Sequence, residues 1–177
     1  MSDSVLSRRS AWTRFTLVAV VALALDVITK IAAVAYLTPA TPVPLLGDLL
    51  RLYLIRNPGA AFSIGEGATW IFTLLAVGVL AFLLIVVVPK LRHGGWAIAL
   101  GLVVAGITGN LIDRLTRPPG FARGHVIDFL QLPYWPIFNI ADMCVVFGAI
   151  AIMFLWLIKG IGHDGVLEKD REKAATS

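Results

Sequence analysis

The stretch WAIALGLVVAGITGNLIDR, residues 96–114, decides the fold of this chain. No Asp, Glu, Lys or Arg interrupts it before Asp113. At about 1.5 Å per helical residue, the run from Trp96 to Asp113 is roughly 25 Å long, close to the thickness of a bilayer's hydrocarbon core. The stretch therefore predicts a transmembrane helix with a carboxylate just inside one face of the membrane, where the cost of burying a charge is lower than at the bilayer centre.

The composition of the whole chain is that of a membrane protein. Its 177 residues are 58% hydrophobic and 15% charged, and the mean hydropathy is +0.86. A soluble domain of this size is nearer half apolar. The net charge of +4 could suggest a nucleic-acid partner, but the basic residues neither cluster with aromatics nor lie on one face, so we expect none. The single cysteine, Cys144, cannot form an intrachain disulfide.

Four apolar segments are long enough to cross a bilayer. We expect spans at about residues 15–37, 70–88, 96–113 and 138–158 of a single membrane domain, 1–177. Prolines and glycines make the intervening segments 38–69 and 114–137 irregular. Within the first of them, the alternation in residues 49–56 predicts a strand. The charged tail 159–177 is expected to be disordered at its end.

The distribution of Lys and Arg predicts the orientation. Nine of these residues lie in the N-terminal segment, the loop after the second span and the tail, whereas five lie in the two irregular segments. Positive charge is enriched on the cytoplasmic side of membrane proteins, so we expect both termini in the cytoplasm and the irregular segments outside.

A second aspartate, Asp142, opens the fourth span. Because consecutive spans run in opposite directions, Asp113 and Asp142 should share one level, near the outer face. Asn110 and Asn139 each precede one of these aspartates by three residues, so each amide lies on the helix face of its carboxylate and can hold it. Two neighbouring carboxylates can share a proton, so that one activates water while the other polarises a carbonyl, as in aspartic peptidases. The alternative is a purely structural role in bonding the helices together.

The first span carries Asp26 and Lys30, four residues apart with the acid first, which favours an ion pair within the helix. The structural interpretation is a pair that ties this helix to its neighbours, and the sharper alternative is direct contact with the catalytic pair or the substrate. The two charges, and the length of the span, also argue against a cleaved signal peptide.

Other chemistries are weaker on spacing alone. They are a Ser63–Lys30 dyad, a Cys144–histidine pair, and a metal site of Asp113, Asp128 and Asp142. Asp128 itself falls in the outer irregular segment rather than on a facing helix, so its loss should be tolerated better than that of Asp113 or Asp142.

Five blocks along the chain together resemble the bacterial lipoprotein signal peptidase family, signal peptidase II. They are residues 26–30, 57–63, 109–114, 126–129 and 138–142. The resemblance implies an intramembrane aspartic endopeptidase of the bacterial inner membrane, with four helices and a small outward-facing sheet that cradles the substrate. It would cut diacylglyceryl-modified prolipoproteins just before the lipid-bearing cysteine. We expect no cofactor or metal, and a monomer in contact with membrane lipids.

The resemblance also assigns residues. Asp113 and Asp142 would be the catalytic pair. Positions that line or support the site would be Asn57, Gly59, Ala60, Phe62, Asn110, Arg114, Asp128, Asn139 and Ala141. The chain departs from the family at Val27, where a polar Gln is common.

An alternative function from another class is a small ion- or proton-coupled transporter with Asp26, Lys30, Asp113 and Asp142 as a relay. Such a protein would have charges through the full depth of the membrane and internal repeats. Here the pair of Asp113 and Asp142 is confined to one level, and the repeated Asn-x-x-Asp pattern is too short to count as an internal repeat.

Overall fold

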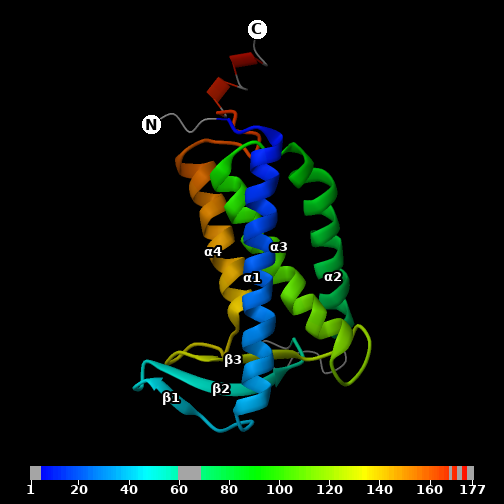
Figure 1. The fold of residues 1–177 in the computed structure, drawn as a ribbon, viewed down its shortest axis with the longest axis vertical. Coiled ribbons are helices and arrows are strands. Elements are labelled where there is room, and N and C mark those ends of the chain that lie inside the picture. Colours follow the sequence, from blue (N-terminus) through cyan, green and yellow to red (C-terminus); the bar gives the residue numbers. More distant parts are fainter. Residues whose placement is uncertain (1–4, 60–68, 168, 171–172, 175–177) are drawn as a thin grey trace.

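The structure is a computed structural model that describes residues 5–59, 69–167, 169–170 and 173–174. In this part of the chain, four long helices stand side by side and a three-stranded sheet crosses one end of the bundle (Figure 1). The described part of the chain begins and ends at the opposite end of the bundle. All four helices are long and apolar enough to cross a membrane. The predicted fold class, four transmembrane helices with a small sheet, is confirmed.

The bundle has four α-helices, and short turns of other helix types extend two of them. Their bounds are α1 Arg8–Tyr36, α2 Thr69–Phe82, α3 Gly94–Thr116 and α4 Ile140–Met153. A π-helical turn, Leu83–Val87, and a 3₁₀ turn, Val88–Lys90, extend α2, and another π-helical turn, Phe154–Ile158, extends α4. Helix α1 begins before the apolar span that starts at residue 15, because the Ser7 side chain accepts a hydrogen bond from Ser10 N at 3.1 Å and caps it.

Helix α3 is the centre of the bundle. In its most apolar window 56% of residues are buried, against at most 22% in the other three helices, whose remaining surface is left for lipid. Small residues let the neighbouring helices approach closely. A Cβ added at Gly106 would lie 2.3 Å from the carbonyl oxygen of Ala141 on α4. Glycine is therefore required where α3 and α4 cross.

The sheet consists of β1 Val43–Leu46, β2 Leu50–Asn57 and β3 Val126–Gln131, in that order and antiparallel throughout. Strand β2 corresponds to the strand that the alternation in residues 49–56 predicts. In the register of β2 and β3, Ile55 faces Asp128 and Asn57 faces Val126. Four successive residues of β3, 126–129, are buried. The sheet therefore carries Asp128 over the end of the helical bundle.

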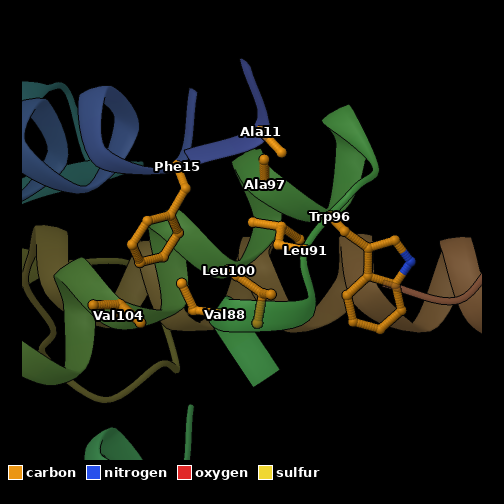
Figure 2. Packing of buried hydrophobic residues seen from close by; sticks show 8 residues of the cluster. All are labelled: Ala11, Phe15, Val88, Leu91, Trp96, Ala97, Leu100 and Val104. Atoms are coloured by element: carbon orange, nitrogen blue, oxygen red, sulfur yellow. The ribbon is translucent and has the colours of Figure 1, made fainter. Parts of the chain in front are cut away.

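An apolar cluster fills the other end of the bundle, near the termini (Figure 2). It consists of Ala11, Phe15, Val88, Leu91, Trp96, Ala97, Leu100 and Val104. The chain after α4 folds back onto it, because Trp96 Nε1 donates a 2.8 Å hydrogen bond to the carbonyl of Ile161. An antiparallel bridge joins Ile161 to Leu167. The start of the tail is thus ordered, whereas its last residues, 175–177, lie outside the described part of the chain.

Candidate active site

Four charged side chains are buried together at the sheet end of the bundle. Asp26, Lys30, Asp113 and Asp128 are each at most 2% exposed. Asp26 and Lys30 come from α1, Asp113 from α3 and Asp128 from β3. Burying a charge is costly unless it is paired and hydrogen-bonded. Their partners therefore determine what this cluster can do.

Lys30 is the cation at the centre of the cluster. Its Nζ lies 2.9 Å from Asp26 Oδ2, 2.9 Å from Asp113 Oδ2 and 3.0 Å from Asn110 Oδ1. The ion pair with Asp26 is the one that the spacing predicts. The contact with Asp113 extends it to α3, so Lys30 connects two acidic residues on different helices. Three oxygens surround an ammonium group that has three protons to donate.

Asp26 brings α1, α3 and α4 together. Its Oδ1 accepts a 2.9 Å hydrogen bond from Ala141 N on α4. On α3, a Cβ added at Gly109 would lie 2.3 Å from Asp26 Oδ2. The carboxylate thus fills the space that Gly109 leaves. Ala141, which the resemblance assigns to the site, contributes its backbone N–H.

Asp113 contacts a second cation that sequence analysis did not identify. Arg117 Nε donates a hydrogen bond to Asp113 Oδ1. The spacing of four residues was the available signal, as for Asp26 and Lys30. Asp113 Oδ2 also accepts a 3.2 Å hydrogen bond from Ile127 N on β3. Asp113 therefore joins α3 to the residue that precedes Asp128.

Asp142 stands in the first turn of α4 and is held by two amides. Asn139 is the N-cap of this helix, and its Oδ1 accepts a 2.9 Å hydrogen bond from Asp142 N. In return, Asn139 N donates a 3.1 Å hydrogen bond to Asp142 Oδ2. Asn110 Nδ2 donates a 2.7 Å bond to Asp142 Oδ1. The spacing predicted that Asn110 holds Asp113 on its own helix. Its amide reaches across to α4 instead.

The position of Asp128 in the outer segment suggested that it lies away from the helices. In the structure, however, Asp128 contacts the N-cap residue of α4. Asn139 Nδ2 donates a 2.6 Å hydrogen bond to Asp128 Oδ1, and Asn57 Nδ2 donates a 2.8 Å bond to Asp128 Oδ2. Burial raises the pKa of Asp128 to about 7, and the negative charge of Asp142 contributes to the increase. The hydrogen bonds from the side-chain amides of Asn57 and Asn139 lower the pKa and so oppose this increase. Asn139 thus connects Asp128 to Asp142.

Asn57 is oriented by the turn that follows β2. Its Oδ1 accepts a 2.8 Å hydrogen bond from Gly59 N. Gly59 has φ +93°, a conformation that side chains other than glycine rarely adopt, and a Cβ there would lie 2.9 Å from the Phe72 ring. The predicted site residues Ala60 and Phe62, and Ser63 of the alternative dyad, lie outside the described part of the chain.

A cavity of about 370 Å³ opens between α2, α3 and α4 beside this network. It is lined by Phe72, Leu75, Ala76, Val79, Gly106, Ile107, Asn110, Arg114, Asp142, Val145 and Val146. Its walls are apolar, and Asn110, Arg114 and Asp142 supply the polar groups. A cavity of about 500 Å³ at the sheet edge, between Arg51 and Trp135, contains none of the buried carboxylates. The cavity of about 370 Å³ is therefore the one in which a bound substrate could reach the Asp142 carboxylate.

Arg114 lies in the wall of this cavity and supplies a positive charge there. Its Nη1 donates a 3.1 Å hydrogen bond to the carbonyl of Asn110. Its Nε is buried without a hydrogen-bond partner in the described part of the chain. Within that same part, no three His, Cys, Asp or Glu side chains are grouped as metal ligands would be.

The family described as signal peptidase (SPase) II matches residues 18–158. A lipoprotein signal peptidase of Leifsonia xyli subsp. xyli is 48% identical over 165 residues, which are 91% of this chain and 76% of the relative. That of Rhodococcus jostii is 50% identical over 148 residues, 84% of this chain and 74% of the relative.

Two solved structures described as bacterial membrane enzymes have the same fold. One has a TM-score of 0.72 at 28% identity and covers 82% of this chain and 88% of its own. The other has a TM-score of 0.73 at 26% identity and covers 89% and 98%. Sequence and fold confirm the resemblance: the chain belongs to the signal peptidase II family, whose members are aspartic-type peptidases that act on lipoprotein precursors.

Proposed function

We propose that this protein cuts diacylglyceryl-modified prolipoproteins just before the lipid-bearing cysteine, with two aspartates and a water molecule. The observation that carries this proposal is the apolar cavity between α2, α3 and α4, which is lined in part by Asp142. Asn139 connects Asp142 to the buried Asp128, whose pKa the charge of Asp142 helps to raise. Family membership disfavours the transporter alternative. Among the described residues, the buried aspartates and Lys30 also lie together at the sheet end of the bundle, whereas a transport relay would extend through its depth.

The sequence-based hypothesis pairs Asp142 with Asp113, but the contacts favour Asp128 as its partner. Both oxygens of Asp113 are occupied, by Arg117, Lys30 and a backbone N–H of β3. Asp128 instead contacts two neutral amides, and its pKa of about 7 lets it carry a proton at neutral pH. A peptidase pair needs one ionised and one protonated carboxyl group.

In this mechanism the ionised Asp142 takes a proton from water while the protonated Asp128 donates its proton to the carbonyl oxygen of the scissile bond. The hydroxide bonds to the carbonyl carbon and forms a tetrahedral diol. Asp142 then gives its proton to the leaving nitrogen, the C–N bond breaks, and Asp128 recovers its proton from the diol. Asn110 and Asn139 orient the two carboxyl groups through their amides.

The apolar walls of the cavity suit the hydrophobic core of a signal peptide. An extended cleavage segment could pair with the small sheet by strand addition. The lipid chains of the substrate remain in the bilayer and supply binding energy away from the reacting carbonyl. With both termini in the cytoplasm, as the positive charges indicate, the site lies near the outer face of the bacterial inner membrane. We propose that the protein acts there as a monomer.

The test is single-turnover cleavage of a diacylglyceryl-modified precursor in detergent, with a chelator present. Asp142→Asn and Asp128→Asn should each lower the rate by about three orders of magnitude, roughly 4 kcal/mol, with the double variant little worse. Asp113→Asn should retain more activity than either. If Asp113→Asn is inactive and Asp128→Asn is not, the original pair of Asp113 and Asp142 is correct. Substantial activity of Asp142→Asn, or abolition by the chelator, would exclude the aspartic mechanism.

A further inference from the structure

Arg117 begins the loop between α3 and β3, and its side chain turns back into the acidic cluster. It is the C-cap of α3, and its backbone N donates a 3.0 Å hydrogen bond to the carbonyl of Asp113. Its side chain is 27% exposed, whereas the Asp113 side chain that it contacts is 3% exposed. The guanidinium group is thus partly buried in order to reach one carboxylate oxygen.

No other cation in the cluster can replace this contact. Lys30 lies within 3.0 Å of three oxygens, as many as its ammonium has protons, and it meets Asp113 only at Oδ2. Arg114 donates to the carbonyl of Asn110 instead. Arg117 is therefore the group that neutralises Asp113 at Oδ1.

The Asp113 carboxylate is in turn hydrogen-bonded to the second residue of β3. Its Oδ2 accepts the hydrogen bond from Ile127 N, and the next residue along β3 is Asp128. Gly124 lets the loop return this closely, because a Cβ there would lie 2.3 Å from the carbonyl oxygen of Asp113. A displacement of the Asp113 carboxylate would therefore be transmitted to Asp128 through one peptide unit.

We propose that Arg117 is a positioning residue of the peptidase, which holds Asp113 so that Asp113 in turn holds Asp128 in register with Asp142. This inference rests on the proposed function, since it assumes that Asp128 carries out proton transfer. Arg117 lies outside the five blocks that carry the family resemblance. It contacts neither Asp128 nor Asp142 directly, so its effect must pass through Asp113 and Ile127.

Four variants test the proposal in the cleavage assay: Arg117→Ala, Arg117→Lys, Asp113→Asn and the double variant Asp113→Asn/Arg117→Ala. Arg117→Ala should lower kcat on the order of tenfold to a hundredfold with little change in KM, because small displacements of reacting groups are costly. Lys restores the charge but not the planar geometry, so Arg117→Lys should recover part of the loss. The double variant should be no slower than Asp113→Asn, since the arginine acts through that carboxylate.

The pH profile separates positioning from simple structural support. The groups around Asp128 are Asp142 on α4, Lys30 on α1, Arg114 on α3, and the amides of Asn57 and Asn139. Loss of Arg117 removes a positive charge from the cluster and leaves the Asp113 carboxylate without its cation at Oδ1. The local field then becomes more negative, which favours the protonated form of Asp128. The alkaline limb of kcat should move to higher pH in Arg117→Ala and return in Arg117→Lys.

The matched control is Arg123→Ala, since Arg123 is an exposed arginine of the same loop, and this variant should behave as the parent. If Arg117→Ala gives no folded protein, Arg117→Gln removes the charge with a smaller change in volume. An unchanged kcat and pH profile in the folded variant would overturn the inference, and so would an additive loss in the double variant. An active Asp128→Asn protein would instead overturn the proposed function on which it rests.

Discussion

Asn139 and Asp142 cap each other: the side chain of each accepts a hydrogen bond from the backbone N–H of the other, at 2.9 and 3.1 Å. This reciprocal arrangement is a capping box, and it satisfies two donors that the first turn of α4 would otherwise leave unpaired. It also places the Asp142 carboxylate at the positive end of the helix dipole. Asn139 thus caps the start of α4 and also holds the Asp142 carboxylate in place.

Asn139→Ala should be unusually costly for a cap substitution. Loss of the cap costs about 1 kcal/mol, and loss of the amide leaves the buried Asp128 Oδ1 without its 2.6 Å bond, at a further 1–3 kcal/mol or so. Activity should fall as well, because the Asn139 amide orients Asp128 and its oxygen caps the helical turn that carries Asp142. The measurements are thermal unfolding in detergent and the cleavage rate. Ser7→Ala removes the cap of α1 at the far end and should lower stability slightly while activity is unchanged. Equal effects of the two variants would contradict this prediction.

The stability of the protein should fall as the pH rises towards neutrality. Burial raises the pKa of Asp128 to about 7 in the folded protein, whereas an aspartate in the unfolded chain titrates near 3.9. Between these values the unfolded state has lost a proton that the folded state keeps. The stabilisation is therefore complete below about pH 4 and is lost as the pH rises through about 7, on the order of 4 kcal/mol in all. Asp128→Asn should remove this component from unfolding curves measured between pH 5 and 8. If the free energy of unfolding of Asp128→Asn depends on pH as steeply as that of the parent, another group is responsible for the pH dependence.

Gly109→Ala and Gly78→Ala should have opposite effects, although both replace a glycine within a helix. A Cβ at Gly109 would meet Asp26 Oδ2 at 2.3 Å, so Asp26 would have to leave Lys30 and Ala141 N. Gly78 on α2 has nothing within 4 Å of an added Cβ, so alanine should stabilise that helix by up to about 1 kcal/mol. Unfolding temperatures of the two purified variants provide the comparison. A stable and active Gly109→Ala protein would show that Asp26 is not held in this space.

Lys30→Met should destabilise the protein more than Asp26→Asn. Without the ammonium group, Asp26 and Asp113 both lose a cation at 2.9 Å, and breaking a buried ion pair costs about 3–5 kcal/mol. Asn at position 26 still offers an oxygen to Ala141 N, and Lys30 keeps Asp113. Folded yield and the unfolding midpoint are the readouts. The reverse order would indicate that Asp26, rather than Lys30, is the centre of the network.

The orientation in the membrane can be tested with cysteine labels. Pro44 on β1 and Pro118 in the loop after α3 are exposed at the sheet end. In a protein without Cys144, cysteines at these positions should react with an impermeant reagent added outside intact cells, because the positive charges indicate cytoplasmic termini. Labelling only after the membrane is broken would reverse the orientation.

The sequence predicted the helices well because hydrophobic length is a local property. It also predicted a strand at residues 49–56, one residue from the observed bounds of β2, because alternation is local as well. It also predicted the Asp26–Lys30 contact, which depends only on helical spacing. It missed the partners of Asn110, which depend on how α3 packs against α1 and α4. It also missed those of Asp128, which depend on how β3 pairs with β2 and returns to the start of α4. The spacing of two residues in the sequence predicts that they share a helix face. It does not predict which residues of other elements pack against that face.

The apolar cluster around Leu91 and Leu100 fills the end of the bundle opposite the sheet, whereas the buried aspartates and Lys30 lie at the sheet end. Lys30 lies six residues before the end of α1, and Asp113 three before the end of α3. An elementary charge that crosses the whole membrane changes energy by about 2.3 kcal/mol per 100 mV. Protons exchanged among side chains at one level cross only a small part of that field. Hydrolysis at this site should therefore proceed at the same rate in energised and in depolarised vesicles, so that the electrical state of the cell does not regulate it.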